Sequence, residues 1–344
     1  MLRRTFLTRL TFALRQNDLD RAQALLNAAA KRGEVTYIAA RVHQSRGEHA
    51  WAAGKATGGT VFLLASITKP MTAAGVMILA DRGELKLEDP VRKFIPEFTG
   101  GERDRITIRH LLTHTSGLPD MLPENEDLRK RHAPLKDFVA GTCRTPLLFS
   151  PGTQVKYQSM GILLASGIVE RITDTPFRDF LKRYVFEPLA MKETSLGLGG
   201  RKIESTAICQ VSGNDDWNWN SPYWRDLGAP WGGAHSSTAD VLRFLQYFLE
   251  PDQRVLKPET ARRMVTNQNQ GLNEPWGIGF IVNGNRFAKK CSPNTFGHWG
   301  STGTICWADP ATRTSFILLT TKPASDSRSS VLAPISDAVA DAAA

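Results

Sequence analysis

The stretch Ala65-Ser66-Ile67-Thr68-Lys69-Pro70 follows a short apolar run and precedes an Ala-rich apolar segment. If a helix begins at Ser66, Lys69 lies one turn further on and on the same face, because residues three apart on a helix are neighbours. Pro70 supports this start, since proline is tolerated in the first helical turn, where backbone N–H groups have no intrahelical partner. Gly83 marks the expected end of the helix. The stretch therefore predicts a helix start that brings a serine hydroxyl next to a lysine amine.

A Ser-x-x-Lys pair is weak evidence when it stands alone. Average serine and lysine usage produces one by chance about once in a chain of this length. A helix-capping serine followed by a solvated lysine is the alternative interpretation. The free N–H groups and the dipole at a helix start also favour negative charge that develops there during a reaction. A catalytic interpretation therefore depends on residues elsewhere in the chain.

The composition is that of an ordinary globular protein with a large core. The chain has 344 residues, of which 41% are hydrophobic and 22% are charged. The net charge of +9 is spread along the chain rather than gathered beside aromatic residues. The basic run Arg129-Lys130-Arg131 has acidic neighbours, which favours a solvated charged loop over a nucleic-acid surface. We expect no nucleic-acid partner.

The cysteines and the N-terminus bear on location. The four cysteines have no spacing typical of a zinc site, so buried thiols in a reducing cell are the simplest interpretation; they are Cys143, Cys209, Cys291 and Cys306. Arg9 and Arg15 interrupt the apolar run that a secretory signal requires. A basic amphipathic surface helix explains residues 1–16 more simply than an organellar transit peptide, which stays open. No stretch is long enough to span a membrane, and we expect a cytoplasmic location and no metal or organic cofactor.

The order of the predicted elements indicates an α+β fold, an antiparallel sheet flanked by helices with an inserted, mostly helical lobe. A helix over residues 17–32, capped by Asn17 or Asp18, leads into short strands, and strands return after Gly271. We expect one domain over residues 23–344 after an N-terminal extension over residues 1–22. Its α/β lobe would span about residues 23–65 and 272–344, and its helical lobe about residues 66–271.

Hydrophobic periodicity and turn residues predict the individual segments. Helices are predicted from Thr107 to Gly117 and over residues 160–172, 177–189, 239–249 and 331–344, and strands over residues 276–282, 304–308 and 315–321.

Two further features allow more than one interpretation. His110 and His114 are four residues apart, the spacing of a helical metal pair, but no third ligand is evident, and satisfied histidines are favoured. An aromatic loop could wall an apolar substrate pocket or pack beneath a long loop; it comprises Trp217, Trp219, Tyr223, Trp224 and Trp231.

Two more motifs accompany Ser66-Ile67-Thr68-Lys69. They are Tyr157-Gln158-Ser159 and His298-Trp299-Gly300, in that order along the chain. Together the three resemble the Ser-x-x-Lys, Tyr-x-Asn and Lys-Thr-Gly elements of serine β-lactamases and penicillin-binding proteins. The flanking stretches HLLTHTSGLP, PGTQVKYQSMG, FEPLAMKETS and GHWGSTGTICWADP are similar to the branch that holds class C β-lactamases, D-alanyl-D-alanine carboxypeptidases and family VIII esterases. The resemblance covers about residues 35–325 and implies a β-lactamase/transpeptidase-like fold.

Each motif residue is expected to have a specific role in the reaction. The Ser66 hydroxyl needs a base within hydrogen-bond reach, and Lys69 can serve only as a neutral amine. The resemblance implies that Tyr157 relays a proton to the leaving group, provided that Lys69 acidifies its phenol. Backbone N–H groups of Ser66 and of Ser301, which follows the His-Trp-Gly element on a predicted edge strand, would form the oxyanion hole.

The remaining motif residues depart from the β-lactamase pattern. Ser159, His298, Trp299 and Gly300 are the expected substrate-binding residues. Ser159 replaces the usual asparagine amide, and His298 replaces a lysine whose fixed charge meets a substrate carboxylate. Both changes weaken recognition of anionic amide substrates and favour an esterase.

We therefore expect a serine hydrolase that acts on small carboxylic esters through an acyl-enzyme on Ser66. A β-lactamase or D-amino-acid peptidase of the same family is the alternative, followed by a non-catalytic scaffold. The expected partner is a small ester or amide substrate, and the sequence does not indicate an oligomeric state.

Overall fold

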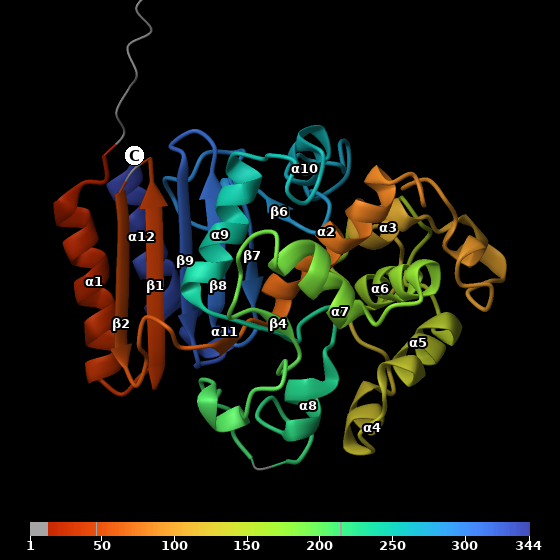
Figure 1. Cartoon of the computed structure of the whole chain (residues 1–344), viewed down its shortest axis with the longest axis horizontal. Helices are drawn as coiled ribbons and strands as arrows, with labels where there is room; N and C mark the ends of the chain where they lie inside the picture. Colours follow the sequence, from red (N-terminus) through yellow and green to blue (C-terminus); the bar gives the residue numbers. More distant parts are fainter. Residues whose placement is uncertain (1–12, 46, 214) are drawn as a thin grey trace, which may run out of the picture.

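A computed structural model describes residues 13–45, 47–213 and 215–344. Its main sheet has the strand order β2-β1-β9-β8-β7-β6, and every neighbouring pair is antiparallel (Figure 1). The strands are β1 (Tyr37–Gln44), β2 (Gly47–Gly54), β6 (Ile281–Val282), β7 (Phe296–Gly300), β8 (Thr304–Asp309) and β9 (Thr314–Thr320). Strands from the two ends of the chain thus form one sheet, as the sequence predicted.

Both faces of this sheet are covered. Phe316 and Leu318 of β9 pack into the apolar cluster that contains α1 (Gln16–Lys31) and α12 (Ala333–Ala343). Ile317 and Leu319 point to the opposite face, because successive side chains of a strand alternate. There they meet a second cluster that contains α9 (Thr238–Leu249) and the helical half of the chain. The central strands β8 and β9 are therefore buried between two layers of helices, whereas the edge strand β2 keeps exposed residues (Figure 1).

Helix α1 closely matches the first predicted helix. It buries Leu19, Ala22 and Leu26. Arg15 precedes the helix at the N-cap position, so the predicted caps Asn17 and Asp18 lie inside it instead. The division of the chain into an extension and one two-lobed domain stays a prediction, and residues 1–12 of the predicted basic helix lie outside the described residues.

The middle of the chain is mostly helical (Figure 1). Its longer helices are α2 (Thr68–Asp81), α5 (Leu135–Arg144), α6 (Met160–Thr173) and α9 (Thr238–Leu249). The shorter ones are α3 (Ile108–Leu112), α4 (Asn125–Lys130), α7 (Phe177–Leu181), α8 (Pro222–Leu227), α10 (Pro258–Met264) and, near the C-terminus, α11 (Ala324–Ser327). A small antiparallel sheet of order β3-β5-β4 joins this half to the main sheet, with β3 (Phe62–Leu63), β4 (Ser195–Leu196) and β5 (Ala234–Ser236). None of the described helices is both long and apolar enough to cross a lipid bilayer.

Three predicted segments differ in detail. The helix expected to run from Thr107 to Gly117 does begin after a Thr107 cap but ends at Leu112, and His114 then adopts a positive φ of 62°. The helix expected over residues 177–189 becomes a π-helical turn after Leu181. The strand expected over residues 276–282 is regular only at β6, because the chain turns through Gly279 at φ 78°.

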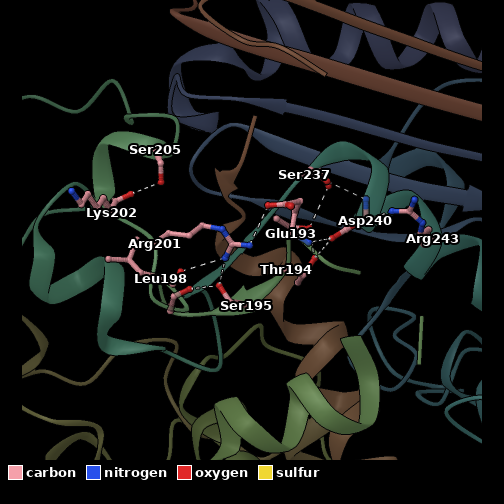
Figure 2. Close-up of polar contacts among 12 residues, drawn as sticks. Glu193, Thr194, Ser195, Leu198, Arg201, Lys202, Ser205, Ser237, Asp240 and Arg243 are labelled. Carbon is pink, nitrogen blue, oxygen red and sulfur yellow. Dashed lines mark hydrogen bonds and ion pairs between the residues drawn. The ribbon is translucent and has the colours of Figure 1, made fainter. Parts of the chain in front are cut away.

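The small sheet is anchored by a buried carboxylate at the start of α9 (Figure 2). Asp240 accepts hydrogen bonds from the Glu193 N–H at 2.7 Å, the Thr194 hydroxyl at 3.0 Å and the Arg243 guanidinium at 2.6 Å. Its own N–H donates to the Ser237 hydroxyl, which caps the helix. Both carboxylate oxygens therefore have partners. We call these residues the Asp240 network.

Candidate active site

Ser66 lies in a tight turn between β3 and α2. The turn is a 3₁₀ segment, Ala65–Ile67, and Ala65 has a positive φ of 48°. The Thr68 hydroxyl donates to the Ala65 carbonyl at 2.7 Å and accepts from the Ala234 N–H at 3.0 Å. These bonds tie the turn to the small sheet, which holds an unfavourable backbone conformation in place. The result is a half-buried serine at the start of α2.

Lys69 lies next to Ser66, as the spacing predicted. Its Nζ is 3.1 Å from Ser66 Oγ and donates to the Trp231 carbonyl at 2.9 Å. The side chain is fully buried, and burial lowers the pKa of Lys69 to about 7, although the negative charge of Asp120 opposes this shift. A large fraction of this amine is therefore neutral near pH 7, the form that can accept a proton.

Tyr157 lies on the other side of Ser66. Its phenol hydrogen-bonds with the Ser66 side chain, and the Lys69 Nζ lies 4.7 Å from the centre of its ring. Burial raises the pKa of Tyr157 well above its ordinary value, and the Ser66 hydrogen bond offsets this only in part. Acidification of the phenol by Lys69, the condition given above for a relay through Tyr157, is therefore not met. A buried amine that is itself half-neutral cannot compensate for the desolvation of a phenolate.

His114 holds the segment that carries Tyr157, and sequence reasoning missed this. The His114 carbonyl accepts from the Lys156 N–H at 2.9 Å, and its Nδ1 accepts from the Gln158 N–H at 3.3 Å. Its ring centre is 4.8 Å from that of Tyr157. The positive φ of His114 turns the chain so that both contacts form, a conformation that the helical interpretation of this stretch concealed.

The two histidines that could have formed a metal pair have separate tasks. His110 Nδ1 accepts from the Thr107 N–H at 3.3 Å as part of a capping box, whereas His114 contacts the Tyr157 segment. Among the residues that the structure describes, no cluster of three or more His, Cys, Asp and Glu side chains could hold a metal ion.

The end of β7 lies against the turn that carries Ser66. The Thr302 hydroxyl donates to the Leu63 carbonyl at 2.8 Å, and the Thr304 hydroxyl donates to the Leu64 carbonyl at 2.9 Å. A Cβ atom at Gly300 would lie 2.3 Å from the Leu64 carbonyl oxygen, so only glycine permits this approach. Ser301 follows as an exposed residue. The predicted oxyanion-hole residues thus come from two segments that are bonded together.

The expectation that this element is an edge strand is wrong. The short strand β6 pairs with the first half of β7, at Phe296 and Gly297. The predicted site residues His298, Trp299 and Gly300 form the second half, which extends beyond the end of β6. The backbone next to Ser66 is therefore the part of β7 that β6 does not reach.

His298 and Trp299 have different surroundings. His298 is buried, and its Nδ1–H donates to the Trp299 carbonyl at 2.6 Å, whereas its Nε2 has no partner among the described residues. Burial, with a smaller effect of the nearby Lys69, lowers the pKa of His298 to about 3, so the ring is neutral near pH 7. The Trp299 indole N–H donates to the Arg286 carbonyl at 2.9 Å, and the Arg328 guanidinium lies 4.5 Å from the centre of its ring.

Ser159 already has a partner. Its hydroxyl donates to Asp120 Oδ1 at 2.6 Å, and its N–H donates to the Asp120 carbonyl at 3.3 Å. Asp120 is exposed, yet it lies close enough to the reactive groups to raise the pKa of both Lys69 and Tyr157. The sequence analysis did not single out Asp120. Its only signal was its position directly after HLLTHTSGLP, a stretch that flanks the site.

The buried tryptophans of the aromatic loop pack against neighbouring side chains. Trp224 and Trp231 are buried, and their ring centres lie 6.3 Å apart. Trp231 also contacts Phe138 of α5, with ring centres 5.8 Å apart, and the Arg129 guanidinium covers Trp224 at 4.0 Å. For these two tryptophans the structure favours packing over a pocket wall. The Trp231 carbonyl nevertheless contributes to the site by holding Lys69.

Comparison with known proteins identifies the family. The Beta-lactamase family model matches residues 20–340. The chain belongs to the beta-lactamase family. It is 34% identical to "Esterase EstB" of Burkholderia gladioli over 197 residues, covering 53% of this chain and 48% of that protein. It is 28% identical to "Putative D-alanyl-D-alanine carboxypeptidase" of Escherichia coli (strain K12) over 309 residues, covering 78% of this chain and 70% of that protein.

A solved structure confirms the fold. The structure titled "EstCE1, a hydrolase with promiscuous acyltransferase activity" matches with a TM-score of 0.80 at 19% identity, covering 94% of this chain and 99% of that one. The predicted β-lactamase/transpeptidase-like fold is therefore correct. Family and fold together make this member of the beta-lactamase family a serine hydrolase, and its relatives include proteins named for esters and for peptides.

Proposed function

We propose that this protein is a carboxylesterase that hydrolyses small esters through an acyl-enzyme on Ser66. The observation that carries the proposal is the buried Lys69 amine, which has a pKa of about 7 and lies 3.1 Å from Ser66 Oγ. A serine hydroxyl becomes an effective nucleophile when a neutral base lies within hydrogen-bond distance. The neutral His298 and the occupied Ser159 then favour esters over anionic amides.

Acylation follows from these positions. Neutral Lys69 takes the Ser66 proton while Ser66 Oγ attacks the ester carbonyl carbon. As the tetrahedral intermediate collapses, the bond from carbon to the leaving oxygen breaks, and the Tyr157 phenol gives its proton to that oxygen. The ammonium of Lys69 then returns a proton to Tyr157. The step releases an alcohol and leaves Ser66 acylated, with both neighbours in their starting protonation states.

The high pKa of Tyr157 fits this role. A phenol that stays protonated can donate to a developing alkoxide, whereas a preformed phenolate could not. In deacylation a water molecule replaces the alcohol and gives its proton to the same pair of residues. Ser66 Oγ then leaves with a proton, and the carboxylic acid is released. Tyr157 and Lys69 therefore exchange roles between the two half-reactions.

The carbonyl oxygen of the substrate becomes negatively charged in both steps. We propose that the backbone N–H groups of Ser66 and Ser301 receive this charge. The support is the close approach of β7 to the Ser66 turn, which Gly300 permits and the two threonine hydroxyls fix. Fixed backbone donors stabilise such charge without reorganising during the reaction.

A second candidate is an amide-directed hydrolase of the same family. It is supported by the similarity to the protein named as a D-alanyl-D-alanine carboxypeptidase. Against it, His298 carries no positive charge for a substrate carboxylate, and the Ser159 hydroxyl already donates to Asp120. A non-catalytic role is disfavoured, because burial that lowers the pKa of Lys69 also lowers stability and brings no benefit to a protein that only binds or assembles.

The test compares the purified protein with its Ser66→Ala variant on p-nitrophenyl acetate, p-nitrophenyl butyrate and a chromogenic cephalosporin. We expect ester turnover that Ser66→Ala abolishes, together with little cephalosporin turnover. A larger kcat/KM for the cephalosporin would support the amide-directed candidate. Ester turnover that survives in Ser66→Ala would contradict the proposed nucleophile.

A further inference from the structure

We propose that Asp120 makes the substrate site selective for esters that carry a positive charge, such as an ammonium group. The inference rests on the proposed esterase function and concerns the substrate class of the same site. It follows from where the acidic and basic side chains around Ser66 lie.

Asp120 places a carboxylate beside the catalytic groups. Its Oδ1 accepts from the Ser159 hydroxyl at 2.6 Å, and Ser159 is two residues from Tyr157. The backbone bond from the Ser159 N–H to the Asp120 carbonyl, at 3.3 Å, fixes the two segments to each other. The carboxylate therefore has a defined position at the start of α6 rather than a free choice of rotamers.

This carboxylate keeps capacity for a ligand. A carboxylate can accept about four hydrogen bonds, and within the described part of the chain the side chain of Asp120 accepts only from Ser159 and forms no ion pair. Asp120 is also exposed, so a substrate can reach its second oxygen. By contrast, the buried Asp240 uses both oxygens on partners within the protein.

Four basic groups that the structure describes near the site do not pair with Asp120. Lys69 is half-neutral near pH 7 and is buried behind Ser66, and His298 is neutral. Arg286 forms an ion pair with Glu274 at 2.8 Å. Arg328 lies over the ring of Trp299, a residue of β7. The side of the site formed by Ser159 thus has an unpaired negative charge.

The attraction between Asp120 and a cationic substrate should be large enough to change kcat/KM measurably. Two unit charges a few ångströms apart attract each other more strongly at a protein surface than in bulk water, because the effective dielectric constant is lower there. A cationic substrate should therefore exceed a neutral one of the same shape by roughly tenfold in kcat/KM, with the advantage falling as salt is added.

The test uses pairs of esters that differ only in charge. One pair is the p-nitrophenyl ester of γ-butyrobetaine and its carbon isostere, in which carbon replaces the quaternary nitrogen. The other pair is acetylthiocholine and its carbon isostere, which places the charge on the leaving group. An anionic ester, p-nitrophenyl hemiglutarate, is measured beside them. The expected result is a preference for the cation in at least one pair that Asp120→Asn reduces roughly tenfold.

Asp20→Asn is the matched control. Asp20 is an exposed aspartate of α1, on the face of the sheet opposite the helical half, and the substitution removes the same charge. This variant should keep the wild-type preference. Because the readout is a ratio of two substrates on one enzyme, a change in overall rate from the effect of Asp120 on Lys69 does not obscure it.

Four outcomes would overturn the inference. Equal kcat/KM within both pairs would contradict it and leave the esterase proposal intact. So would a preference for the anionic ester, which would assign selectivity to Arg328, or a cation preference that Asp120→Asn leaves unchanged. Absence of turnover on every ester would contradict the inference and the esterase proposal together.

Discussion

Two buried polar regions of this protein differ in how completely their polar groups find hydrogen-bond partners. In the Asp240 network both carboxylate oxygens have partners, and Arg243 balances the charge. Around Ser66 the Lys69 amine is buried without a carboxylate partner among the described residues, and the neighbouring His298 Nε2 has no partner among them either. A satisfied network stabilises the fold, whereas an incompletely satisfied one keeps groups available for reaction at a cost in stability.

Loss of the nucleophile should have the greatest effect, and it should change activity rather than stability. Ser66→Ala should lower kcat/KM for p-nitrophenyl butyrate by at least about 10⁴-fold, because it removes the nucleophile. The melting temperature should stay close to that of the wild type, since Ser66 is half-buried and carries little packing. Thermal unfolding and steady-state kinetics on the same preparation check both statements. A large loss of stability would mean that Ser66 mainly supports the turn.

Tyr157→Phe should have the next largest effect. It removes the proton donor and keeps the ring that packs on His114, so kcat/KM should fall by about 10²–10⁴-fold. The loss should be greatest for esters with basic leaving groups, which need a proton most. A loss of the same size for p-nitrophenyl and ethyl esters would argue that Tyr157 only positions other groups.

The pH dependence tests the buried amine. Because the pKa of Lys69 is lowered to about 7 and the neutral form is the base, kcat/KM should rise with pH and level off above about 7. His298, with a pKa of about 3, should not contribute, so His298→Gln should keep the same midpoint whatever its rate. A rise of kcat/KM with pH whose midpoint lies near 10.5, the ordinary pKa of a lysine, would contradict the assignment of Lys69 as the base.

The smallest effects are on stability and have opposite signs in the two regions. Asp240→Asn should lower the free energy of unfolding by about 1–3 kcal/mol, because one of the two acceptor oxygens becomes an NH2 group that cannot accept from the donor facing it. The folded variant should keep its kcat/KM.

Lys69→Met should abolish turnover yet raise the free energy of unfolding by roughly 1–2 kcal/mol, because it removes a desolvated amine. Urea unfolding of both variants measures the difference.

The gain from Lys69→Met should depend on pH. The pKa of Lys69 is lower in the folded state than the ordinary value of 10.5, so the unfolded chain binds the proton more tightly. Wild-type stability therefore rises with pH between about 7 and 10.5 through this group. The advantage of the methionine variant should shrink over the same interval. An advantage that grows with pH would contradict the lowered pKa.

Much of the site could be predicted because its contacts are local or carried by motifs. Ser66 and Lys69 meet across one helical turn, which sequence spacing specifies directly. That the His-Trp-Gly element lies beside the Ser66 turn was expected only through the resemblance of the motifs, because the contact joins distant parts of the chain. The sheet likewise followed from strand patterns at the two ends of the sequence.

What escaped prediction depends on backbone conformation and on burial. His114 contacts both neighbours of Tyr157 only because its φ is positive, which no periodic pattern indicates. Asp120 reaches Ser159 because the loop after His114 folds back on the start of α6. The raised pKa of Tyr157 reflects how completely the fold buries the phenol, and a sequence does not reveal the depth of burial.

The proposed mechanism requires that Ser66 carries a covalent acyl group during turnover. The direct measurement is rapid quenching of the enzyme during hydrolysis of p-nitrophenyl acetate, followed by peptide mass spectrometry. We expect one acetyl group on the peptide that contains Ser66, formed in the wild type and absent from Ser66→Ala and Lys69→Met. Hydrolysis without any acylated peptide, or with the acetyl group on another residue that turns over at the catalytic rate, would contradict it.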